Sequence, residues 1–108
     1  MTQNADAKPD KKIVVDVDSD IEDLIPGFLE NRQEDVKSIY DALEKEDYET
    51  IRILGHSMKG VGGGYGFDEI TDIGRSIEES AEGKNPEEVK KWVINLSNYL
   101  DRVEIVYV

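Results

Sequence analysis

Residues 47–67 read DYETIRILGHSMKGVGGGYGF and combine a regular apolar pattern with a cluster of glycines. Apolar side chains recur every three or four positions, which is the spacing of one face of an α-helix, at Ile51, Leu54, Met58, Val61 and Tyr65. Asp47 stands where an N-cap is expected, and Gly66 stands where a helix ends. The stretch therefore predicts a helix that begins near residue 47 and continues to the turn at Gly66.

Three other segments show the same helical spacing. The first has apolar positions from Ile21 to Leu43, and its helix is predicted to start at about Asp23, because Pro26 is tolerated in a first turn. The third stripe starts after Asp68 and stops at Gly83; its members are Ile70, Ile73, Gly74, Ile77 and Ala81. Asn85 is expected to cap a fourth helix that reaches the C-terminus, with apolar positions at Val89, Val93, Leu96, Leu100, Val103 and Tyr107.

The turns between these segments are only a few residues long, so successive helices are expected to be antiparallel neighbours. The predicted fold is all-α, an antiparallel up-down-up-down four-helix bundle. The β-branched segment IVVDV at 13–17 is too short for a helix and predicts a short N-terminal extended arm. Residues 1–12 are polar and predict a disordered lead-in, which leaves 13–108 as one domain.

Composition excludes several classes of function. Twenty-five acidic against 13 basic side chains give a net charge of -12, which argues against binding to nucleic acid or to an anionic membrane. The chain has no cysteine and one histidine, so thiolate and multi-histidine metal sites are excluded, and no calcium-loop spacing is present. We expect no metal site. No signal peptide and no run of about 18 apolar residues is found, which predicts a cytoplasmic protein.

The single histidine, His56, points away from the predicted core. It lies about 140 degrees from Ile51 at 100 degrees per residue, nearly opposite the apolar stripe. Arg52, one turn before it, and Lys59, three residues after it, share this outward face. Such cations are the hydrogen-bond donors that a phosphoryl group on the imidazole would need.

Gly60 and Gly63 fall on the same outward side of the predicted helix. Each glycine within a helix costs on the order of 1 kcal/mol relative to alanine, so a compensating role is expected. Without side chains beside the imidazole, the backbone of another protein can approach His56 closely. Gly64 and Gly66 are instead interpreted as residues that end the helix.

Glu78 is the one acidic residue singled out from the many solvated carboxylates. It lies at the flank of the third stripe, where side chains reach toward the neighbouring helix. A carboxylate there would accept the proton of one imidazole nitrogen of His56 and leave the other unprotonated.

Residues 56–67, HSMKGVGGGYGF, resemble the motif of histidine-containing phosphotransfer (HPt) domains, H-x-[LM]-K-G followed by small residues and a glycine ten after the histidine. The resemblance extends from about residue 20 to the end of the chain. LIPGFLENR at 24–32 and LDRV at 100–103 resemble stand-alone, single-domain members. The N-terminal arm has no counterpart in the family pattern.

This resemblance implies a phosphorelay intermediate of two-component signalling in which His56 is the phosphoacceptor. It implies that Lys59 lies by the phosphoryl group, that Gly60 leaves room for a response-regulator receiver domain, and that Glu78 hydrogen-bonds the imidazole. Partners would be a receiver domain, a hybrid sensor kinase or both, with transfer through Nε2 and no cofactor except the magnesium held by the receiver. Without an ATP-binding segment, the protein would be a phosphotransfer protein and not a kinase. We expect it to be a monomer. Ile53, on the outward side of the helix, is our candidate for docking the receiver.

Two other classes of function remain to be compared. A helical adaptor would bind a receiver or kinase without accepting phosphate. A hydrolase would use His56 and Glu78, but a nucleophile and an oxyanion arrangement are not apparent. GHSMK at 55–59 does not match the G-x-S-x-G motif, and the glycines match no nucleotide-binding loop.

Overall fold

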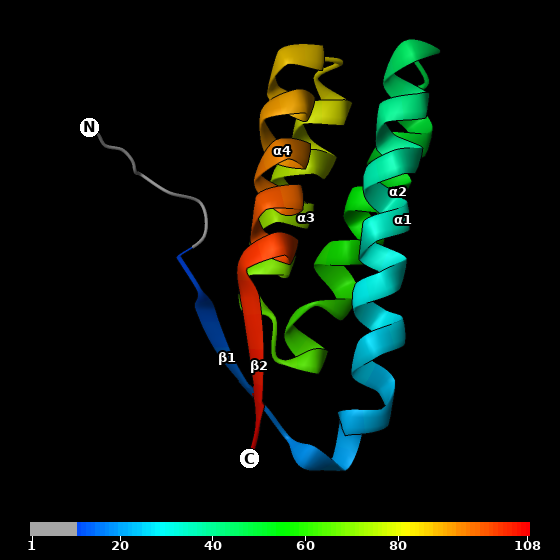
Figure 1. The fold of residues 1–108 in the computed structure, drawn as a ribbon. Coiled ribbons are helices and arrows are strands. Elements are labelled where there is room, and N and C mark those ends of the chain that lie inside the picture. The colour runs from blue at the N-terminus through cyan, green and yellow to red at the C-terminus, as the bar shows by residue number, and fades with distance from the viewer. Residues whose placement is uncertain (1–10) are drawn as a thin grey trace, which may run out of the picture.

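The computed structural model describes residues 11–108 and is mostly helical (Figure 1). In chain order the elements are β1 (Ile13–Val17), the 3-10 helix η2 (Ser19–Leu24), α1 (Ile25–Glu44), α2 (Tyr48–Val61), the 3-10 helix η3 (Gly63–Tyr65), α3 (Asp68–Glu82), α4 (Pro86–Arg102) and β2 (Val103–Tyr107). The prediction of four helices is confirmed. The predicted lead-in, 1–12, lies outside the described residues except for Lys11 and Lys12, which are exposed.

Local sequence signals place the helix starts correctly at two of the turns. Asp47 Oδ1 accepts a hydrogen bond from the Thr50 N–H at 3.1 Å, and its Oδ2 accepts one from the Thr50 hydroxyl at 2.6 Å. Asn85 Oδ1 likewise accepts from the Glu88 N–H at 3.2 Å. Both N-cap predictions are confirmed, because each side chain satisfies a backbone N–H that has no partner within the helix. α1 starts two residues later than expected, at Ile25, because η2 occupies the preceding turn.

The four helices lie side by side around one apolar core (Figure 1). Every helix contributes fully buried side chains, among them Ile39, Ile51, Met58, Ile70, Ile77, Val89, Val93 and Leu96. At the end of the bundle near the strands, the Phe28 ring stacks on Tyr65 and Phe67, with centroids 4.5 and 5.3 Å apart. The aromatic stack holds the glycine-rich turn after α2 against α1.

The second helix is shorter than its apolar pattern predicts. α2 ends at Val61, and residues 63–65 form the 3-10 helix η3 instead of a further α-helical turn. Gly62 is responsible, since its carbonyl accepts hydrogen bonds from the N–H groups of both Tyr65 and Phe67. Gly66 then reverses the chain with φ 95°, a left-handed conformation that glycine adopts without steric cost. The apolar spacing of a helix continues to Tyr65, but the α-helical hydrogen bonding of the backbone does not.

The prediction that the fourth helix reaches the C-terminus is wrong. α4 ends at Arg102, and β2 pairs in parallel with β1, in a register that joins Ile13 to Val103 and Val17 to Tyr107. The predicted all-α class is therefore corrected, because the fold also contains a small two-stranded sheet. Val103 and Tyr107 also fit a helical stripe, but the alternation in VEIVY buries one side of a strand equally well.

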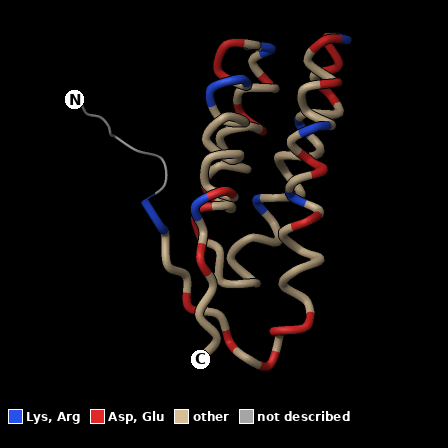
Figure 2. The backbone as a smooth tube through the Cα atoms, viewed as in Figure 1, with Lys and Arg blue, Asp and Glu red and all other residues tan. Residues whose placement is uncertain are grey.

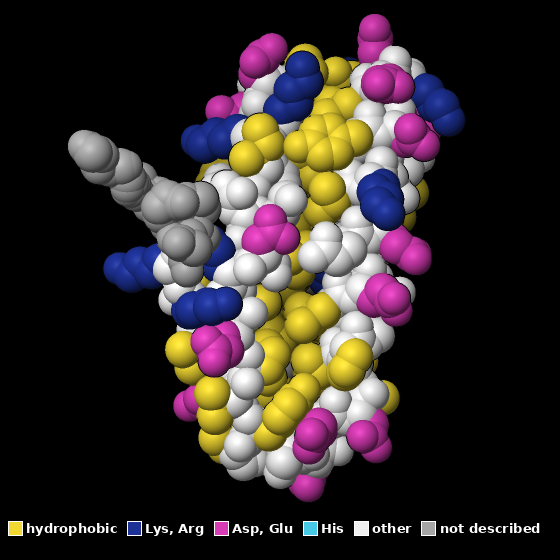
Figure 3. Space-filling view, viewed as in Figure 1, with side chains coloured by type: hydrophobic (Ala, Val, Ile, Leu, Met, Phe, Trp, Pro, Cys, Tyr) yellow, Lys and Arg dark blue, Asp and Glu magenta, His cyan; other side chains and the backbone are white. Residues whose placement is uncertain are grey.

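The helices differ in charge and in the faces that they expose. Acidic residues outnumber basic ones on α1 and α3, whereas α2 carries Arg52 and Lys59 against Glu49 alone (Figure 2). Figure 3 shows apolar side chains gathered between α1 and α4, and no histidine is visible on that face.

None of the helices in the described part of the chain combines the length and the apolar character needed to cross a bilayer.

Candidate functional site

His56 lies on the outer side of α2, between buried neighbours. Gly55 before it and Met58 after it are buried, whereas 64% of the histidine side chain is exposed. The helical periodicity that turns Ile51 and Met58 into the core turns His56 toward solvent. The imidazole is thus open to another molecule.

Glu78 of α3 holds both His56 and Lys59. Its Oε2 lies 2.9 Å from His56 Nδ1, and its Oε1 lies 2.8 Å from Lys59 Nζ. Within residues 11–108, Glu78 is the only buried charged residue, with 8% of its surface exposed. A buried carboxylate is costly unless it is paired, and here both of its oxygens have a partner.

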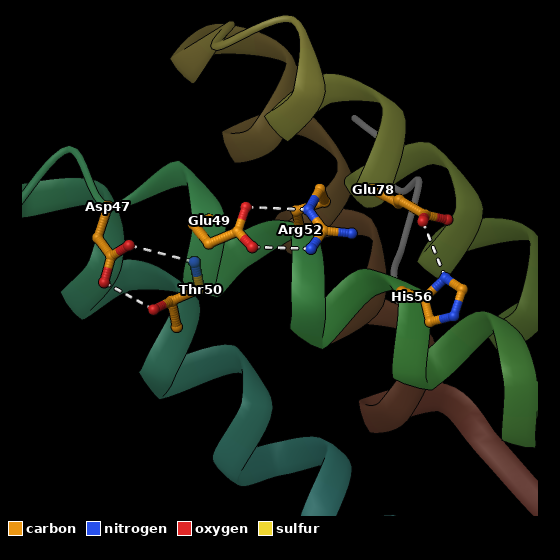
Figure 4. Close-up of polar contacts among 6 residues, drawn as sticks. All are labelled: Asp47, Glu49, Thr50, Arg52, His56 and Glu78. Carbon is orange, nitrogen blue, oxygen red and sulfur yellow. Dashed lines mark hydrogen bonds and ion pairs between the residues drawn. The ribbon is translucent and has the colours of Figure 1, made fainter.

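The ionisation of Glu78 decides which imidazole nitrogen carries the proton. The hydrogen bond from Lys59 lowers the pKa of Glu78, with a further lowering by His56, and these effects outweigh the opposing effect of burial. At neutral pH Glu78 is therefore a carboxylate, which can only accept hydrogen bonds. Nδ1 must then be the donor, and a neutral ring leaves its lone pair on Nε2, on the side away from Glu78 (Figure 4).

The structure separates the two cations that the sequence grouped around His56. Lys59 Nζ reaches the site through Glu78. Arg52 points its guanidinium at Glu49, with Nε 3.0 Å from Oε1 and Nη2 2.8 Å from Oε2 (Figure 4). This bidentate bond to Glu49 is the main cause of the raised pKa of Arg52, and the charge of Glu78 adds to it from a greater distance. Arg52 is thus one turn from the imidazole but bound to another residue.

Gly60 and Gly63 have different surroundings, contrary to their shared position on the predicted helix. A Cβ added at Gly60 meets no atom within 4 Å, so this face of α2 is open. Gly63 lies in η3, where its N–H donates to Thr71 Oγ1 at 2.8 Å. The early end of α2 removes Gly63 from the face on which the helical spacing had placed it. Ile53 is exposed over 51% of its surface, one turn before His56.

Three residues that shape the site were not predicted to do so. Gly55 and Gly74 bring the backbones of α2 and α3 into contact: a Cβ at Gly55 lies 2.7 Å from Glu78 N, and one at Gly74 lies 2.6 Å from Lys59 N. Thr71 Oγ1 donates to the Lys59 carbonyl at 3.2 Å. The glycine within the apolar stripe of 68–82 was a usable signal, because a glycine among core positions indicates close helix packing.

No metal-binding cluster accompanies the histidine. Across residues 11–108, no group of three or more His, Cys, Asp or Glu side chains is arranged to hold a metal ion. The chemical groups at the site are an exposed imidazole, a buried carboxylate and an ammonium.

Comparison with known proteins agrees with this geometry. The family model described as Hpt domain matches residues 23–104, a region that contains all four helices together with His56, Lys59 and Glu78. No curated protein and no solved structure matches the chain. Hpt domains are phosphotransfer modules of two-component phosphorelays and are neither kinases nor ATPases. Since the match spans most of its length, the chain belongs to the Hpt domain family.

Proposed function

We propose that this protein is a phosphorelay intermediate that accepts a phosphoryl group on His56 Nε2 and exchanges it with the aspartate of a response-regulator receiver domain. The observation that carries the proposal is the contact between His56 Nδ1 and the ionised Glu78, beside an otherwise exposed ring. It leaves one nitrogen of the imidazole as a nucleophile and presents that nitrogen to solvent.

The transfer step follows from this arrangement. The Nε2 lone pair forms the P–N bond while the P–O bond to the partner's aspartate breaks, so the aspartate leaves as a carboxylate. The ring keeps its Nδ1 proton and becomes cationic, and Glu78 stabilises the positive charge. In the reverse direction, the same carboxylate holds the ring in place while the phosphoryl group returns to the receiver.

The surroundings of His56 suit such an exchange. Lys59 and, more distantly, Arg52 give α2 an excess of basic side chains in an acidic protein, which favours the approach of a phosphoryl group. Gly60 leaves the backbone uncovered one turn after the histidine, so a receiver loop can come close. The antiparallel up-down-up-down bundle is the proposed scaffold, the receiver supplies the magnesium ion, and a hybrid sensor kinase is the proposed upstream partner.

The test is phosphoryl transfer from a purified, phosphorylated receiver. The wild-type protein should acquire an acid-labile phosphoryl group within the time in which the receiver loses it. His56→Gln should acquire none, while its circular dichroism spectrum stays helical. Labelling of His56→Gln to the wild-type level would rule out His56 as the acceptor.

The second candidate is an adaptor that binds a receiver or kinase without accepting phosphate. The exposed Ile53 would serve docking under this function as well. An adaptor would bind the receiver equally well after His56→Gln and would never contain phosphohistidine, so the same experiment separates the two functions.

A further inference from the structure

The backbones of α2 and α3 touch along a line of glycines that runs beside the site. An ideal Cβ at Gly55 would lie 2.7 Å from Glu78 N and 2.8 Å from the Gly74 carbonyl oxygen. One at Gly74 would lie 2.6 Å from Lys59 N, and one at Gly62 would lie 2.7 Å from Thr71 N. All of these distances are shorter than a real Cβ permits, and their partners are backbone atoms that cannot turn aside.

These contacts follow a single order along both helices. Contacts made from Gly55 through Lys59 to Gly62 run backwards along α3, to Glu78, then Gly74, then Thr71. The two helices are therefore antiparallel and in contact over about two turns. Helix axes in proteins are usually 8 to 10 Å apart, depending on the side chains between them, and glycines permit the closest approach.

The close approach decides where the functional side chains stand. Gly55 directly precedes His56, and Glu78 Cα lies 3.1 Å from the Cβ position of Gly55. The backbone of Glu78 thus lies against the backbone of α2, and its side chain extends along the surface of α2 to Nδ1 of His56 and Nζ of Lys59. A wider spacing of the helices would move the carboxylate away from both partners at once.

We infer that Gly55, Gly62 and Gly74 are positioning residues that set the distance between the imidazole of His56 and the carboxylate of Glu78. They touch no reacting atom and act through the spacing of α2 and α3. The inference deepens the proposed function and rests on it only for the consequence in transfer rate, because the hydrogen bond exists without phosphate.

Imidazole NMR on the unphosphorylated protein tests the positioning directly. His56 is the only histidine in the chain, so the long-range proton–nitrogen spectrum of its ring is unambiguous. Under conditions where the ring is neutral, the wild type should show a single tautomer protonated at Nδ1. Gly55→Ala, Gly62→Ala and Gly74→Ala are made singly, and each variant that stays helical should show exchange between both tautomers.

Gly60→Ala is the matched control for this spectrum. It makes the same substitution within α2, but its Cβ meets nothing within 4 Å. The Nδ1 tautomer should persist in it. Persistence of that tautomer in helical Gly55→Ala and Gly74→Ala as well would overturn the inference. If none of the three variants folds, the glycines determine the fold rather than the site, and the inference is also overturned.

A double substitution distinguishes positioning from general destabilisation. Gly74→Ala should slow transfer from a phosphorylated receiver by about tenfold or more, since misplacement by about 1 Å can cost a hundredfold. In the Glu78→Ala background, which has no acceptor for Nδ1–H, it should add less than about twofold, because the contact is already lost. Gly27→Ala, whose Cβ also meets nothing, should transfer at the wild-type rate. A full effect of Gly74→Ala in both backgrounds would contradict a role through Glu78.

These outcomes separate the inference from the proposed function. If His56→Gln accepts phosphate, the proposed function fails while the tautomer measurement still decides the role of the glycines. If the glycine substitutions leave the tautomer of the unphosphorylated ring unchanged, and the transfer experiment shows that His56 accepts phosphate, only the inference fails.

Discussion

Glu78 is a buried carboxylate whose ionised form is stabilised by two partners on another helix. Burial alone would raise its pKa, but the hydrogen bond from Lys59 and the contact with His56 lower it below its ordinary value of 4.5. Because the folded state binds the proton less tightly than the unfolded chain, ionised Glu78 stabilises the fold above about pH 4.5. This contribution is lost as the pH falls through the lowered pKa.

Glu78→Gln should therefore change the acid dependence of stability. We expect the free energy of unfolding of the wild type to fall more steeply than that of the variant as the pH decreases below about 4.5. Denaturant unfolding followed by circular dichroism, between about pH 3 and pH 7, measures both curves. Glu79→Gln, which removes the adjacent exposed carboxylate, should keep the wild-type slope. Equal slopes for wild type and Glu78→Gln would contradict the pairing.

Lys59 and Arg52 should differ in their effect on transfer. Lys59→Ala removes an ammonium from beside His56 and is expected to slow phosphoryl transfer by about tenfold or more. Arg52→Ala should slow it by less than about threefold, because the guanidinium is held by Glu49. Rapid-mixing measurements of transfer from a phosphorylated receiver compare the two variants. A larger loss with Arg52→Ala would mean that its guanidinium leaves Glu49 in the complex.

Helix α2 is divided lengthwise into a core side, a side that contacts α3 and an open side. Ile51 and Met58 are fully buried, Gly55 lies against α3, and Ile53 and His56 are exposed. The amphipathic pattern predicted the core side and the outward direction of His56. It could not separate the side that contacts α3 from the open side, because a glycine has no side chain whose polarity shows what it faces.

Ile53 should contribute to docking and not to folding. Ile53→Asp is expected to slow transfer by about tenfold while the free energy of unfolding changes by less than about 0.5 kcal/mol, as is usual for exposed positions. Ile94→Asp is the matched control, since Ile94 of α4 is equally exposed, at 49% against 51%, and the substitution adds the same charge. Equal rates for the two variants would remove Ile53 from the proposed interface.

In the whole molecule, the two strands tie the ends of the domain together. β1 and β2 are separated by all four helices in the chain and pair in parallel, and Arg102 Nε donates to the Lys11 carbonyl at 2.9 Å beside them. Val17 at the end of β1 is 1% exposed and belongs to the core, whereas Val14 on the same strand is 61% exposed. The sheet thus covers one end of the bundle with one of its sides.

Val17→Ala should test this covering role. It removes two buried methyl groups and leaves a cavity, so we expect a loss of about 2 kcal/mol in the free energy of unfolding. Val14→Ala, the same substitution at an exposed position of β1, should cost less than about 0.5 kcal/mol. Denaturant titration of both variants decides, and a similar small loss for each would show that the sheet does not stabilise the bundle.

Local patterns in the chain were enough to predict the four helices, two N-caps and an outward His56. Each of these depends on residues a few positions apart, where helical periodicity and capping chemistry operate. Glu78 was predicted as a partner of His56 from its place at the flank of the third stripe and from the family resemblance, and the fold supplies their separation. Two features required the folded molecule: the end of α2 at Val61 and the pairing of β1 with β2. They depend on contacts between distant segments, which local patterns do not reveal. The apolar stripe through Val103 and Tyr107, for example, was equally compatible with a helix and with a strand. The spacing of α2 and α3, set where Gly55 meets Gly74, decides whether Glu78 can reach the imidazole at all.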